Sequence, residues 1–205
     1  MTNTNALIRL DEIDVEIIQL ASEATEIRQG LTIPTIGGQI TPYTIVDLVG
    51  KLTINEGSVW YPYKERDLNL LTHHVIHHTA VNGDSTPEAV ARFHSINNGW
   101  PGIGYTFYIG QDGTIYRVNR STTKSFATAD MNHRYISTCL AGSFIHGRKP
   151  TLDQLNAARW VHNVAIPSDV GKVLPLLGHK QGDQQQTTCP GTSFNEWRGI
   201  IEAPY

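Results

Sequence analysis

The sequence predicts an α/β protein in which a central mixed β-sheet is flanked by helices, with an N-terminal helical segment. Two observations predict this class. Strand-like and helix-like patterns follow one another along most of the chain, as expected for a sheet covered by helices. The 205 residues also suffice for one good-sized core and a small appendage.

The N-terminal segment, residues 1–30, is expected to be an amphipathic helix. Apolar residues from Ala6 to Leu31 recur at alternating steps of four and three, a heptad pattern held for more than three heptads. This stripe suits self-association through residues 6–31 and packing on the chain's own domain about equally. Three further apolar residues widen it beyond a narrow seam, namely Leu7, Val15 and Ile18.

Residues 31–65 are expected to be a linker or a small helical cap. Prolines and the pair Gly37-Gly38 punctuate this segment, a short helix is expected from about 43 to 52, and Asn55-Glu56-Gly57 indicates a turn. No pattern in these residues indicates a catalytic or metal-binding role. Residues 66–205 are therefore expected to form the main domain and to carry any active site.

Strand and helix signals alternate through residues 66–205. Pro87 suits the first position of a helix that starts at 85–88, and Thr151 is a good N-cap. Gly110 to Gly113 indicates a hairpin between two strands. The expected strands are 70–79, 105–109, 114–118, 137–144 and 174–177, and the other expected helices are 151–164 and 193–201.

Composition excludes several classes of function. Apolar and charged contents of 40% and 17% are those of an ordinary globular protein. A net charge of -3 gives no basis for binding nucleic acid. No apolar stretch is long enough to span a bilayer, and the N-terminus lacks a basic region followed by an apolar run. We therefore expect no membrane insertion and no signal peptide.

Three residues, His77, His179 and Cys189, form a good zinc-binding set. Two imidazoles and a thiolate would leave one of four tetrahedral positions for water, which distinguishes a catalytic zinc from a structural one. The chain has no CxxC cluster of the kind found in zinc fingers, so the fold must bring distant segments together. His78 competes with His77, because neighbours on a strand point to opposite faces. The other cysteine, Cys139, is expected to be a small core residue.

Four motifs, in this order, resemble one family. They are Val-Ile-His-His-Thr-Ala (75–80), Gly-Trp-Pro-Gly-Ile-Gly-Tyr-Thr-Phe-Tyr-Ile-Gly (99–110), Asp-Gly-Thr-Ile-Tyr (112–116) and Thr-Thr-Cys-Pro-Gly (187–191). Together they resemble the zinc-dependent N-acetylmuramoyl-L-alanine amidases, a family that includes phage lysozyme-type amidases and peptidoglycan recognition proteins. The resemblance covers roughly residues 70–202.

The resemblance implies one Zn²⁺ per chain, held by His77, His179 and Cys189. Zinc would lower the pKa of a bound water toward ~7 and polarise the scissile carbonyl. Tyr105, in the Gly-Tyr-x-Phe motif, would donate to the oxyanion or move a proton. Thr187 would hydrogen-bond the carbonyl oxygen.

Four further residues are expected near the substrate, each with an ordinary alternative. They are His78, Trp100, His133 and Lys180. Trp100 suits the core equally well, and His133 suits a surface loop. Lys180 would supply a charge that Thr187 lacks. The chain also departs from the family twice, in the long interval between residues 179 and 189 and in the lack of a histidine at 125–128.

The function implied is hydrolysis of the amide bond between N-acetylmuramic acid and L-alanine in bacterial peptidoglycan. The expected setting is a bacteriolytic, antimicrobial phage endolysin or virion-associated lysin. Such a protein would be made in the host cytoplasm and would reach the cell wall through holin-type release or in the virion. The alternatives are a non-catalytic peptidoglycan-binding module and a virion structural component.

Overall fold

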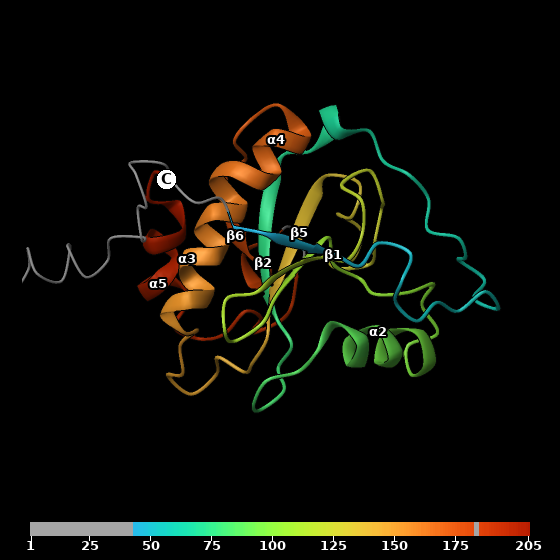
Figure 1. The fold of residues 1–205 in the computed structure, drawn as a ribbon, viewed down its shortest axis with the longest axis horizontal. Coiled ribbons are helices and arrows are strands. Elements are labelled where there is room, and N and C mark those ends of the chain that lie inside the picture. The colour runs from blue at the N-terminus through green and yellow to red at the C-terminus, as the bar shows by residue number, and fades with distance from the viewer. Residues whose placement is uncertain (1–42, 183–184) are drawn as a thin grey trace, which may run out of the picture. The chain divides into compact units, whose positions relative to one another are not determined.

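A mixed sheet of six strands lies at the centre of the computed structural model, which describes residues 43–182 and 185–205 (Figure 1). The strand order is β1-β4-β3-β5-β2-β6. Only β3 and β4 pair antiparallel; the other neighbours are parallel. The strands are β1 (Ile45–Asp47), β2 (His73–His78), β3 (Phe107–Ile109), β4 (Ile115–Arg117), β5 (Tyr135–Leu140) and β6 (Leu176–Gly178).

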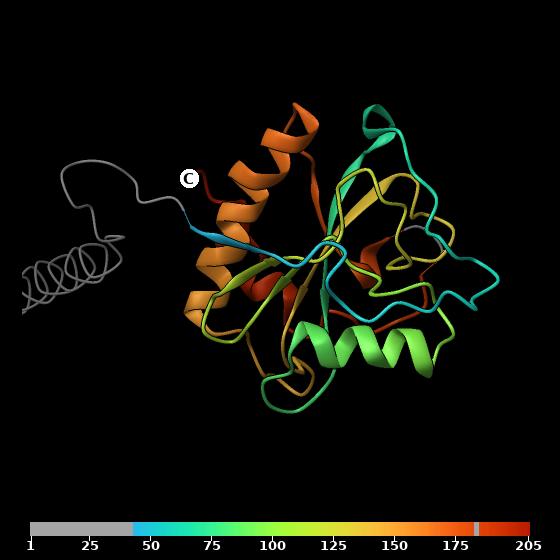
Figure 2. The ribbon, with the colours of Figure 1, turned by 45° about the vertical axis from the view of Figure 1, so that its right-hand side comes forward.

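Helices cover both faces of the sheet, as Figures 1 and 2 show. Helix α2 lies on one face, and α3, α4 and α5 lie on the other, where their apolar residues form the larger core with β2, β3 and β5. The helices are α2 (Pro87–Ile96), α3 (Leu152–Trp160), α4 (Ile166–Val170) and α5 (Phe194–Glu202). This arrangement confirms the predicted fold class.

The alternation of side chains along β2 assigns its histidines to opposite faces. Ile76 belongs to the core beneath α3 and α5, and His74 and His78 share its side of the strand. His77 lies on the other side, paired in register with Cys139, which is fully buried in the smaller core beneath α2. The expectation that Cys139 is a core residue is thereby confirmed.

The helix expected over residues 43–52 is wrong. Residues 45–47 form β1, which pairs with residues 115–117 of β4, and the backbone N–H of Leu48 continues the pairing to the carbonyl of Arg117 at 2.9 Å. A distant strand edge thus supplies backbone partners that a local helix would otherwise have supplied, and tertiary pairing overrides the local signal. The residues from Tyr43 onward form one compact unit.

The helix predicted from residue 151 is longer than expected. Thr151 caps α3 in a capping box with Gln154, as the sequence indicates. A π-helical turn, Val161–Ala165, then joins α3 to α4, which accommodates Pro167 near its start and ends at Gly171 in the left-handed conformation (φ 77°). The other strands and helices predicted within residues 66–205 match the observed ones to within a few residues.

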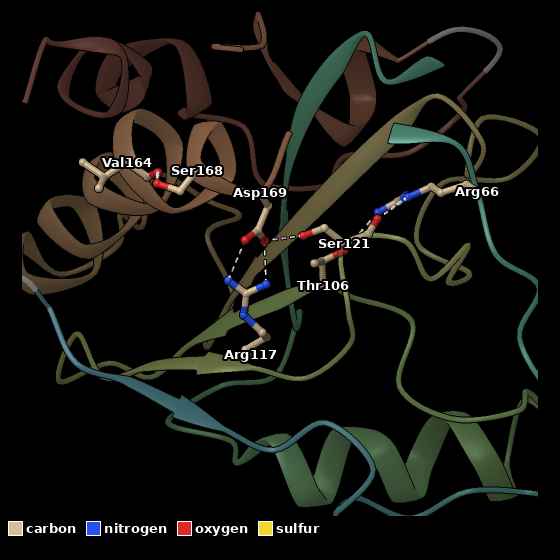
Figure 3. A network of polar contacts seen from close by, with 7 residues as sticks. All are labelled: Arg66, Thr106, Arg117, Ser121, Val164, Ser168 and Asp169. Atoms are coloured by element: carbon tan, nitrogen blue, oxygen red, sulfur yellow. Dashed lines mark hydrogen bonds and ion pairs between the residues drawn. The ribbon is translucent and has the colours of Figure 1, made fainter. Parts of the chain in front are cut away.

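Two arginines, Arg66 (buried) and Arg117 (partly buried), connect the loops to this frame (Figure 3). Arg117 on β4 makes a two-pronged ion pair with Asp169 of α4, at 2.5 and 3.2 Å, and Ser121 donates to the same carboxylate at 2.6 Å. Arg66 donates to the backbone oxygens of Ser121 and Asn132, at 2.9 and 3.0 Å. Burial lowers the pKa of Arg66 to about 10, so its guanidinium still carries a charge at neutral pH.

The predicted N-terminal helix, residues 1–30, lies outside the described residues, as do residues 31–42. Among the helices that the structure describes, none combines the length and the apolar character needed to cross a membrane.

Candidate metal centre

The three residues of the predicted zinc set converge at one end of the sheet. His77 lies near the end of β2, and β6 runs beside β2 with Gly178 opposite Ile76, so His179 follows at the same edge. The backbone N–H of Lys180 donates to the carbonyl of Cys189 at 2.7 Å, which returns the chain to this point. The ligand atoms of His77, His179 and Cys189 all lie within 4.8 Å of one another.

The donor set fits zinc. His77 Nδ1 lies 3.8 Å from Cys189 Sγ, and the rings of His77 and His179 are 4.4 Å apart between centroids. Two nitrogens and one sulfur are soft enough to favour zinc over magnesium or calcium, which prefer oxygen. Both imidazoles are neutral at pH 7, because burial lowers the pKa of each. Neutral imidazole is the form that binds a metal.

The turn at Cys189 is set by a glycine. Gly191 has φ 133°, and a Cβ there would lie 2.1 Å from the carbonyl oxygen of Phe144, so no other residue fits. The backbone N–H of His78 donates to Cys189 Sγ at 3.4 Å. Burial raises the pKa of Cys189 to about 12, against the opposing effects of that N–H and of Lys180. The thiol is therefore protonated at neutral pH, and a metal that bound there would displace its proton.

Tyr105 stands beside the metal centre, with its ring 5.3 Å from that of His77. Gly104 before it can have no side chain, because a Cβ there would lie 2.8 Å from the carbonyl oxygen of Phe126. The backbone N–H of Gly104 donates to His94 Nδ1 at 3.1 Å, and this bond anchors the segment around Tyr105 to α2. Burial raises the pKa of the Tyr105 phenol, so the hydroxyl remains a hydrogen-bond donor at neutral pH.

Thr187 is exposed beside Cys189. Its Oγ1 accepts a hydrogen bond from the backbone N–H of Cys189 at 3.1 Å. That contact stabilises the turn and uses the oxygen as an acceptor, so the hydroxyl proton can be donated elsewhere.

A pocket of about 560 Å³ opens beside His179. Trp100 lines it, as the sequence suggested, with its ring 4.7 Å from that of His94. Most of the other lining residues carry no motif in the sequence, although the aromatic residues at 60–63 are a visible signal for one of them, Trp60. The lining consists of Trp60, Trp100, Phe126, Ala127, Ala129, Asp130, Asn132, His179 and Gln185.

The three other expected substrate contacts do not line this pocket. His78 turns to the opposite face of the sheet, where its Nδ1 accepts from the backbone N–H of Phe144 at 3.1 Å. Lys180 Nζ donates to the carbonyl of Gly191 at 2.7 Å, so it supports the turn after Cys189. His133 is exposed on a turn.

Comparison with known proteins agrees with these features. A family model described as N-acetylmuramoyl-L-alanine amidase matches residues 68–192. Peptidoglycan-recognition protein SC2 of Drosophila melanogaster is 32% identical over 142 residues, which are 64% of this chain and 73% of that protein. The N-acetylmuramoyl-L-alanine amidase of Sus scrofa is 33% identical over 115 residues, which are 54% of this chain and 18% of that protein.

Solved structures extend the similarity to the fold. The endolysin LysCS of Clostridium intestinale is 27% identical with a TM-score of 0.60, and the match covers 78% of this chain and 97% of that one. The endolysin of bacteriophage Ph2119 from Thermus scotoductus is 25% identical with a TM-score of 0.62, over 77% and 99% of the two chains. The match over more than half of the sequence, together with the fold, shows that this chain belongs to the N-acetylmuramoyl-L-alanine amidase family.

Proposed function

We propose that the protein is a zinc-dependent hydrolase that cleaves the amide bond between N-acetylmuramic acid and L-alanine in bacterial peptidoglycan. The convergence of His77, His179 and Cys189 carries the proposal, because all three donors lie together and His179 also lines an open pocket. When bound there, zinc supplies an activated water and polarises the scissile carbonyl.

Two side chains assist at the carbonyl oxygen in this proposal. Tyr105, kept protonated by burial, donates its O–H to the oxygen as negative charge develops. Thr187 is fixed by the backbone N–H of Cys189 and points its own proton to the same oxygen. Neither residue carries a charge, so stabilisation of the negative charge on that oxygen depends on where the two hydroxyl donors are placed.

The aromatic residues of the pocket hold the muropeptide in this proposal. Trp60, Trp100 and Phe126 present ring faces and edges, and Trp60 is 53% exposed, so a ligand can reach it directly. Aromatic faces pack well against the apolar faces of sugar rings and against peptide. Delivery to the cell wall by holin-type release, or as part of a virion, belongs to the same proposal.

The test is mass analysis of the products released from purified peptidoglycan. An amidase leaves intact glycan strands and stem peptides that begin with free L-alanine. The second function to be distinguished is binding without hydrolysis, which the recognition proteins among the relatives favour. A zinc-loaded protein that sediments with peptidoglycan but releases no free L-alanine termini would establish that second function instead.

A further inference from the structure

Each imidazole of the metal centre is held at one ring nitrogen by a loop residue. His77 Nε2 lies 3.4 Å from Thr128 Oγ1, and His179 Nε2 lies 3.0 Å from Gln185 Oε1. Both loop residues lie where the sequence departs from the family resemblance. Thr128 belongs to the segment that lacks a histidine, and Gln185 belongs to the long interval between residues 179 and 189.

We infer that Thr128 and Gln185 are positioning residues that fix both imidazoles with Nδ1 toward the metal. The inference rests on the proposed zinc site. A neutral imidazole has one N–H and one lone pair. An oxygen that accepts from Nε2–H therefore leaves the lone pair on Nδ1 for the metal, and such outer partners orient a histidine ligand. His77 already has its Nδ1 3.8 Å from Cys189 Sγ.

The orientation of the Gln185 amide supports this assignment. Gln185 Nε2 donates to the carbonyl oxygen of Ala129 at 2.9 Å. A carbonyl accepts only from the NH₂ group, so Oε1 is the amide atom that faces His179. That oxygen can accept a hydrogen bond from His179 Nε2–H but cannot donate one. The contact therefore specifies the tautomer of His179 as well as the direction of its ring.

A single turn, residues 127–132, connects the two supports: it contains Thr128 and is bound by Gln185. Gln185 binds Ala129, which follows Thr128 directly, and the backbone N–H of Thr128 donates to Asn132 Oδ1 at 2.8 Å. The carbonyl of Asn132 accepts from the buried guanidinium of Arg66 at 3.0 Å. The turn over residues 127–132 is thus anchored to the frame on one side and to both imidazoles on the other. The long interval after His179 has a role, because it returns an amide onto that histidine.

The experiment measures zinc and histidine directly, in the full chain. In zinc-loaded protein labelled with ¹⁵N-histidine, long-range ¹H–¹⁵N correlation is expected to show protonated Nε2 and metal-bound Nδ1 in His77 and His179. In competition with a chelator, Thr128→Val and Gln185→Ala are each expected to weaken zinc binding by about 10–100-fold. Thr128→Ser keeps the acceptor oxygen and is expected to retain most of the affinity.

Matched controls separate positioning from general damage to the fold. Thr138 makes the same kind of bond, to His74 Nε2 at 2.8 Å, on the other face of the sheet, so Thr138→Val is expected to leave zinc affinity unchanged. Gln186 is an exposed neighbour, and Gln186→Ala is expected to do the same.

Unchanged zinc affinity in Thr128→Val and Gln185→Ala, or metal on Nε2 of His179, would overturn the inference. These measurements use no substrate. A protein that binds zinc in the expected way but does not hydrolyse peptidoglycan would refute the proposed function and leave the inference standing.

Discussion

Two histidine pairs lie on opposite faces of the same strand, and only one of them faces a third donor. His74 stacks on His162 with centroids 5.3 Å apart, and the two Nδ1 atoms are 3.0 Å apart. His77 lies 4.4 Å from His179 between centroids. In each pair the β2 histidine has a threonine at Nε2, Thr138 in one and Thr128 in the other.

The two pairs differ in the partner that Nδ1 of the β2 histidine faces. Both ring nitrogens of His74 have protein partners, and the ring is fully buried beneath the helices, so no lone pair is left for a ligand. His77 has its Nδ1 toward the Cys189 thiol, and its partner His179 lines an open pocket. His77 and His179 are thus candidate metal ligands because a third donor, Cys189, faces them, whereas residue type alone does not distinguish the two pairs.

The largest effect is expected from removing the third donor. Cys189→Ser should abolish tight zinc binding and hydrolysis together, because a neutral hydroxyl is a poor zinc ligand. Zinc content per chain and release of free L-alanine termini from peptidoglycan measure the two losses. His162→Phe, on the other face, should retain both. Full hydrolysis by metal-free Cys189→Ser protein would refute the proposed mechanism.

The next effect tests the donor beside the metal centre. Tyr105→Phe keeps the ring against His77 and removes only the hydroxyl. We expect turnover to fall by roughly 100-fold, as for loss of one oxyanion or proton-transfer group, with zinc content unchanged. The measurement is the rate of L-alanine terminus release at saturating peptidoglycan. Turnover near that of the parent protein would make Tyr105 a purely structural residue.

A smaller effect tests the assignment of faces on β2. His78→Ala should keep zinc at full occupancy, because the imidazole lies on the side away from His77. It should lower the free energy of unfolding by about 1–3 kcal/mol, since the buried N–H of Phe144 loses its acceptor. Urea denaturation and metal analysis of the same sample check both values. Loss of zinc from folded protein would exchange the roles of His77 and His78.

Local patterns predicted the parts of the molecule that depend on neighbouring residues. The Thr151 cap and the proline at the start of α2 were read directly from sequence and are confirmed. The ligand residues were identifiable because motifs surround them. Strand β1 was missed because its partner, β4, lies far along the chain. Thr128 and Gln185 were missed because their importance arises only from contacts that loops make after folding.

The last effect is a pH dependence of stability alone, which belongs to the structural pair His74 and His162. Burial lowers the pKa of His74, and the neighbouring His162 lowers it further. Burial also lowers the pKa of His162, where Glu202 opposes the shift and Arg198 adds to it. Both histidines therefore bind protons more readily when unfolded. Their contribution to stability is present above the ordinary pKa of about 6.5 and is lost as the pH falls below it.

The slope of stability with pH separates this pair from the other histidines. Each histidine whose pKa is lowered by folding makes the free energy of unfolding fall by up to about 1.4 kcal/mol per pH unit below pH ~6.5. The double variant His74→Phe/His162→Phe removes both groups and retains Glu202 and Arg198. Urea denaturation at several pH values between 7.5 and 5 should therefore show a shallower loss of stability in the variant than in the parent. Equal slopes would mean that the pair is as protonated in the folded chain as in the unfolded one, which would contradict a buried pair that stays neutral through its mutual contact.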